Sequence, residues 1–172
     1  MSGRSGAASI IADVGYVSGS TRLFAILGDP IEQVRSPEMV TAQLVARGAD
    51  AVLVPMHVTA ADLDGVVASL KRIRNFGGLV FTIPHKAAAL RHCDALGPQG
   101  IAVGAVNALA RRPDGSWVGE MFDGLGCVAA FAAAGHALRD RRVTLIGAGG
   151  AGSAIAVAVA GGAPASLHIA EL

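Results

Sequence analysis

The segment VTLIGAGGAGSA, residues 143–154, restricts the possible folds more than any other part of this sequence. An apolar run typical of a buried strand leads into Gly147, Gly149 and Gly152, which have G-x-G-x-x-G spacing, and a helix is expected to follow. In such a unit one glycine forms the tight turn, one lets a pyrophosphate approach the backbone, and one lets helix and strand pack closely. The pattern predicts a Rossmann-type dinucleotide site that also includes Gly150, and a glycine turn without a ligand is the alternative.

The strand predicted after this helix, residues 166–170, leads to a second cofactor residue. It ends in Glu171, 22 residues after Gly149, where a carboxylate would accept hydrogen bonds from the adenosine ribose hydroxyls. The same carboxylate would repel a 2′-phosphate, so the expected cofactor is NAD or NADP, with NAD slightly favoured. Because the chain stops at Leu172 after one βαβ unit, we expect an incomplete Rossmann-type unit in a fragment of a longer protein, and a vestigial second half is the alternative.

Residues 143–170 carry no formally charged side chain, which makes a membrane-spanning helix a competing interpretation. Six glycines and Pro164 would destabilise that helix, so the βαβ unit is favoured. A net charge of +1 gives no electrostatic reason to expect nucleic acid or an anionic membrane as partner. Cys93 and Cys127 lack metal-ligand spacing and are too few for a disulfide framework, so no metal site is predicted. No secretory signal opens the chain, and a cytoplasmic location is expected.

Strands and helices alternate ahead of the βαβ unit. The predicted strands are the apolar runs 23–27, 51–56 and 79–83. The helices expected after them are 37–47, with Ser36 as N-cap and Gly48 as C-cap, 63–73 and 86–96. A hairpin of 106–111 and 117–121 and a helix from Asp123 to near Gly135 follow. With 52% hydrophobic residues, this alternation predicts an α/β fold on a mixed, largely parallel sheet.

Five motifs resemble, in order and spacing, those of the shikimate and quinate dehydrogenases. They are GDPIEQVRSP (28–37), FTIPHK (81–86), GAVNAL (104–109), MFDGLG (121–126) and GAGGAGSA (147–154). The resemblance implies a substrate-binding α/β domain followed by a Rossmann-type NAD(P) domain. The expected division is a loose arm at 1–20, a substrate domain at 21–124, a connecting helix and joint at 125–141, and a truncated dinucleotide-binding unit at 142–172.

The resemblance also implies the site residues. Lys86 and Asp123 would be the catalytic pair, and Ser36, Thr82 and Asn107 would bind the hydroxyls and carboxylate of the substrate. The chemistry agrees, because hydride transfer from a secondary alcohol requires a base that takes the hydroxyl proton. Each residue taken alone has another interpretation: a solvated lysine, an N-cap aspartate and a turn asparagine.

The motifs depart from the family pattern at several polar positions. Val34 stands where the family has a carboxylate-binding serine, Val80 replaces an asparagine, Ala108 replaces a threonine, and Met121-Phe122 replace Asn-Thr. A site built to hydrogen-bond a polyhydroxy acid loses affinity for it when such partners are removed. We therefore expect a hydroxy or keto acid that is less polar than shikimate.

The sequence predicts an NAD(P)-dependent oxidoreductase of the shikimate dehydrogenase type, a family that the resemblance connects with aromatic amino acid biosynthesis. A non-catalytic module that senses a small acid is the alternative, although it would need neither Lys86 nor Asp123. A homodimer is one way in which residues 125–172 could bury their apolar surface.

Overall fold

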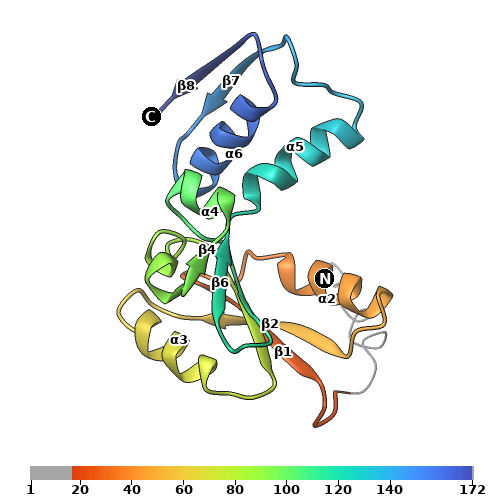
Figure 1. Ribbon diagram of the computed structural model, residues 1–172, viewed down its shortest axis with the longest axis vertical. Helices are drawn as coiled ribbons and strands as arrows, with labels where there is room; N and C mark the ends of the chain where they lie inside the picture. Colours follow the sequence, from red (N-terminus) through yellow and green to blue (C-terminus); the bar gives the residue numbers. More distant parts are fainter. Residues whose placement is uncertain (1–16, 172) are drawn as a thin grey trace, which may run out of the picture. The chain divides into compact units, whose positions relative to one another are not determined.

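The computed structural model describes residues 17–171, which divide into two compact units between Thr82 and Ile83 (Figure 1). Most of the predicted arm at 1–20 lies outside the described residues. Each unit contains its own strands, and the mixed, largely parallel α/β fold predicted from the sequence is confirmed. The division at 124 and 141 that the resemblance implies stays a prediction.

The first unit is a parallel three-stranded arrangement in the order β2-β1-β3. Strand β1 (Arg22–Gly28) lies between β2 (Ala51–His57) and β3 (Phe76–Phe81), and both pairings are parallel. Helix α2 (Ser36–Ala46) follows β1 and helix α3 (Leu63–Lys71) follows β2. The connection from β1 to β2 through α2 and the connection from β2 to β3 through α3 run in opposite directions across the sheet. The two helices therefore lie on opposite sides of the strands (Figure 1). Strands β1, β2 and β3 correspond to the three strands predicted from the apolar runs.

The ends of these elements differ from the predictions in two places. Helix α2 begins at Ser36 itself, and the residue before it, Arg35, occupies the N-cap without a side-chain hydrogen bond. Gly48 has the predicted left-handed backbone after the helix, with φ +72°. Strand β3 begins three residues earlier than expected and ends at Phe81, because the residues just before Pro84 leave the sheet.

The second unit begins with a region where a predicted helix is absent. Instead of a helix over 86–96, the chain forms a short 3-10 helix, η1 (Ala88–His92), and a two-residue strand, β4 (Ala95–Leu96). The backbone carbonyl of Lys86 accepts the N–H of Val106 (2.9 Å) rather than that of Leu90, whose N–H donates to Ala87. This long-range hydrogen bond replaces the first turn of the predicted helix.

The predicted hairpin is confirmed and is extended by β4. Strands β5 (Ala108–Arg111) and β6 (Trp117–Glu120) are antiparallel, and β4 pairs parallel to β6. Helix α4 (Pro98–Val103) is a six-residue segment that is absent from the predicted elements. Glu120 accepts the N–H of Gly100 in this helix (2.7 Å), so α4 depends on a residue distant in the sequence.

The βαβ unit has the predicted elements. Strand β7 (Arg142–Ile146) pairs parallel to β8 (Ser166–Ala170), and helix α6 (Gly150–Gly161) connects them. Helix α5 (Asp123–Ala133) packs along α6 (Figure 1). Across residues 17–171, the helices are too short or too polar to span a membrane, and residues 143–170 form two strands and a helix.

Candidate active site

The centre of the candidate site is an ion pair between Lys86 and Asp123. Lys86 Nζ donates to Asp123 Oδ2 at 2.6 Å, and the two side chains are 15% and 26% exposed. Lys86 lies between the end of β3 and η1, whereas Asp123 is the first residue of α5, 37 residues later. A charged donor and acceptor at this separation form a strong hydrogen bond. The structure brings together the two residues predicted as a catalytic pair.

Asn107 fixes the other oxygen of the carboxylate. Its Nδ2 donates to Asp123 Oδ1 at 2.6 Å, and its Oδ1 accepts the backbone N–H of Phe122 at 2.9 Å. These two bonds determine the orientation of the amide, since the donor must face the carboxylate. Asp123 does not act as an N-cap, because Phe122 occupies that position of α5 and has no side-chain cap. The carboxylate is thus held by Lys86 and Asn107.

The lysine retains donors for a ligand. An ammonium group has three N–H donors, and Asp123 takes one of them. His85, the neighbouring residue, is 1% exposed and lies in the interior. A substrate oxygen near Lys86 could therefore accept a hydrogen bond and exchange a proton with the amine.

Ser36 and Thr82 belong to the first unit. Ser36 is the first residue of α2 and Thr82 directly follows β3, where its backbone N–H donates to the carbonyl of Leu27 (3.0 Å). Both residues are partly exposed. Their assignment to substrate binding stays a prediction.

The glycine turn has a distinct requirement at each motif position. Gly147 has φ +89°, a left-handed backbone that L residues rarely adopt. A Cβ at Gly152 would lie 2.1 Å from the carbonyl oxygen of Gly147, so only glycine lets the helix pack on the turn. Gly149 is the N-cap of α6, and a Cβ there would meet nothing within 4 Å. The turn therefore opens onto free space at the position where a pyrophosphate is expected to approach.

Glu171 lies beside the same turn. Its Oε2 accepts the backbone N–H of Ala148, the residue between the first two glycines of the motif. The end of β8 is thus joined to the loop between β7 and α6. This places the carboxylate next to the turn, and its assignment to the ribose site stays a prediction.

Met121 is a core residue of the second unit. It is 1% exposed and forms a core cluster with Ala105 and Ala154, so its apolar side chain fills the interior and does not line an open site. Phe122 is 52% exposed and directly precedes Asp123. Of these two apolar residues beside the aspartate, only Phe122 is exposed to solvent.

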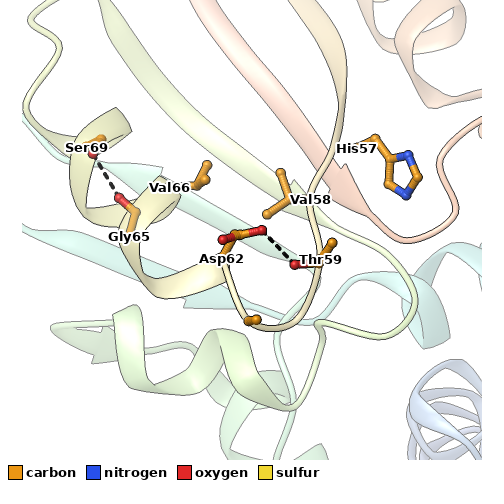
Figure 2. Close-up of a pocket in the computed structure, with 8 residues that line it drawn as sticks. His57, Val58, Thr59, Asp62, Gly65, Val66 and Ser69 are labelled. Carbon is orange, nitrogen blue, oxygen red and sulfur yellow. Dashed lines mark hydrogen bonds between the residues drawn. The ribbon is translucent and has the colours of Figure 1, made fainter.

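A separate shallow pocket of about 550 Å³ lies in the first unit, around the N-terminal half of α3 (Figure 2). Its polar side chains are partly satisfied locally, since Thr59 Oγ1 donates to Asp62 (2.7 Å) and Ser69 Oγ donates to the carbonyl of Gly65 (2.8 Å). None of the predicted catalytic or binding residues lines this pocket. The candidate site therefore consists of the ion pair and the glycine turn, which lie outside this pocket.

Comparison with known proteins assigns the family. Residues 26–109 match the family model described as the shikimate dehydrogenase substrate binding domain. The shikimate dehydrogenase (NADP(+)) of Lysinibacillus sphaericus (strain C3-41) is 39% identical over 137 residues, which are 79% of this chain and 49% of that protein. This chain belongs to the shikimate dehydrogenase family. The resemblance read from the five motifs is confirmed.

Solved structures of two similar proteins have the same fold as this chain. Shikimate 5-dehydrogenase from Listeria monocytogenes, in complex with shikimate and NAD, is 30% identical with a TM-score of 0.82 over 90% of this chain and 53% of that one. The ligand-free 5-ketofructose reductase of Gluconobacter sp. strain CHM43 is 32% identical with a TM-score of 0.77 over 87% of this chain and 53% of that one. The chain therefore spans about half the length of these relatives.

Proposed function

We propose that this chain is the N-terminal part of an NAD(P)-dependent oxidoreductase that interconverts a hydroxy acid and the corresponding keto acid. The observation that carries the proposal is the Lys86–Asp123 pair held by Asn107, with distances of 2.6 Å on both sides of the carboxylate. A binding module would not need a lysine and an aspartate in this arrangement, whereas proton transfer to or from a substrate oxygen does.

Lys86 acts on the proton of the reacting oxygen. In ketone reduction its ammonium donates a proton to the carbonyl oxygen as a hydride arrives at the carbonyl carbon, and the C=O bond becomes C–OH. In alcohol oxidation the amine accepts the hydroxyl proton as the C–H bond breaks with its electron pair. Asp123 holds the ammonium in place and stabilises its charge, while Asn107 fixes the carboxylate.

The glycine turn fits a dinucleotide, which when bound supplies or accepts the hydride. Open space at Gly149, the left-handed backbone of Gly147 and the start of α6 suit a pyrophosphate. NAD or NADP is the proposed cofactor. The preference for NAD rests on Glu171 alone, and the Lysinibacillus relative is named for NADP(+).

The proposed substrate is less polar than shikimate. Val34, Val80, Ala108 and Phe122 stand at positions where the family motifs carry polar side chains, and Phe122 is exposed beside Asp123. A site without these hydrogen-bonding partners no longer favours a polyhydroxy acid. The similar 5-ketofructose reductase is an instance in which a protein of this fold is named for another carbonyl substrate.

A substrate screen tests this function. The complete gene product is incubated with NAD⁺ or NADP⁺ and with shikimate, quinate and simpler cyclic or linear hydroxy acids, and the absorbance of the reduced cofactor is followed. Turnover fastest with an acid of fewer hydroxyls is expected. Saturable binding of such an acid without any turnover would instead favour the sensor module, and turnover confined to shikimate would contradict the substrate proposal.

A further inference from the structure

The hydrocarbon stem of Lys86 lies against the first turn of α6. A Cβ atom built at Gly150, the first residue of that helix, would lie 3.3 Å from Cδ and 3.6 Å from Cβ of Lys86. Contacts of 3.3 Å are tighter than ordinary van der Waals contact between carbons. A side chain at position 150 would therefore press on the lysine stem, which would have to give way by a few tenths of an ångström for a single Cβ and further for a larger residue.

The partner of the lysine rests on the same face of α6. Gly124 directly follows Asp123, and a Cβ there would lie 2.1 Å from the carbonyl oxygen of Ala154 and 2.9 Å from the Cβ of Ala158. Positions 150, 154 and 158 are spaced four apart, so they share one face of the helix. The Lys86–Asp123 pair is thus seated on this face, with Lys86 at Gly150 and the start of α5 at Ala154 and Ala158.

The neighbouring glycine faces a different way. A Cβ at Gly149 would meet nothing within 4 Å, whereas one at Gly150 would meet the lysine. The backbone of Gly150 is helical, a conformation that every L residue adopts without strain. Neither backbone conformation nor open space for a phosphate accounts for glycine at this position.

We infer that Gly150 is a positioning residue for Lys86: the absence of a side chain lets the lysine lie on α6, so that its amine reaches Asp123. The catalytic consequence rests on the proposed function, but the positioning itself does not. A larger residue at 150 pushes the stem outward, and the amine then leaves its place at 2.6 Å from the carboxylate. The dinucleotide turn and the acid–base pair are thereby joined through one glycine.

The sequence offers a direct readout, because the chain contains two lysines, Lys71 and Lys86. The 172-residue chain is labelled with ¹³C-lysine, and the NMR signals of the two ε-methylene groups are recorded, with Lys71 on α3 as the internal reference. Asp123→Asn assigns the Lys86 signal and marks the position it takes when the ion pair is lost. Gly150→Ala and Gly150→Val are then compared with Gly149→Ala, a matched glycine change in the same turn.

The Lys86 signal should move toward its Asp123→Asn position in Gly150→Ala and further in Gly150→Val, while the Lys71 signal stays in place. Gly149→Ala should leave both signals unchanged. An unmoved Lys86 signal in Gly150→Val, with circular dichroism as in the parent, would overturn the inference; if that variant does not fold, an unmoved signal in Gly150→Ala would do so. Failure of the proposed function would appear differently, as absent turnover with these lysine shifts intact.

Discussion

The packing of α5 on α6 predicts opposite outcomes for two glycines of the same helix. In Gly124→Ala the new Cβ would lie 2.1 Å from the carbonyl oxygen of Ala154 and 2.6 Å from its carbonyl carbon, and neither backbone atom can move without shifting the helix. In Gly126→Ala the new Cβ meets nothing within 4 Å. Both changes gain roughly the same helix propensity, up to about 1 kcal/mol, so their difference isolates the steric cost.

Forcing an extra carbon into a packed interface costs about 1–3 kcal/mol. Gly124→Ala should therefore have a free energy of unfolding about 1–3 kcal/mol lower than Gly126→Ala, which itself should be equal to or more stable than the parent. Urea unfolding followed by circular dichroism measures both values under the same conditions. Equal stabilities of the two variants would refute the close approach of α5 and α6, and with it the seating of Asp123 on α6.

Three further predictions concern the glycine turn, the cofactor and the response to acid. Gly147→Ala should lower the free energy of unfolding by about 1–2 kcal/mol relative to Gly149→Ala, because position 147 has φ +89°; equal unfolding energies would contradict the turn. Glu171→Ser should raise the affinity for NADP relative to NAD in calorimetric titrations, since it removes a carboxylate that repels a 2′-phosphate, and an unchanged ratio would exclude Glu171 from the ribose site. Hydrogen bonds from Thr21 and Ser20 lower the pKa of Asp50, so they stabilise the fold above the ordinary aspartate pKa of about 3.9 and cease to do so as pH falls through the lowered value. Thr21→Val should thus be less stable than the parent at neutral pH, and a gap in unfolding free energy that stays constant below pH of about 4 would contradict this linkage.

The sequence predicts best where local geometry alone determines the backbone. The end of β7 and the start of α6 follow from the glycine spacing, because the turn between them needs Gly147 and Gly152 whatever the rest of the chain does. The absent helix over 86–96 shows the converse. There the carbonyl of Lys86 accepts the backbone N–H of Val106, and no local sequence pattern predicts a hydrogen bond between residues so far apart in the chain.

In the candidate site, too, some features could be predicted from the sequence and others could not. Lys86 and Asp123 are 37 residues apart, and their pairing was expected from the family motifs, since composition and spacing do not reveal such a contact. Burial of Met121 was missed because a motif places a residue in the chain but does not show which way its side chain points. The contact of Gly150 with Lys86 was missed because the dinucleotide motif already accounted for a glycine in the turn.

If Lys86 exchanges the proton of the reacting oxygen, its removal should slow turnover and spare the binding of both ligands. The complete gene product, its Lys86→Ala variant and the matched Lys71→Ala variant are assayed with the best acid from the substrate screen and the preferred dinucleotide. We expect Lys86→Ala to lower kcat by about 10²-fold or more, while calorimetry still detects binding of the acid and of the dinucleotide. Lys71→Ala should keep the parent kcat. An unchanged kcat in Lys86→Ala would show that Lys86 does not transfer this proton, and would remove it from the mechanism.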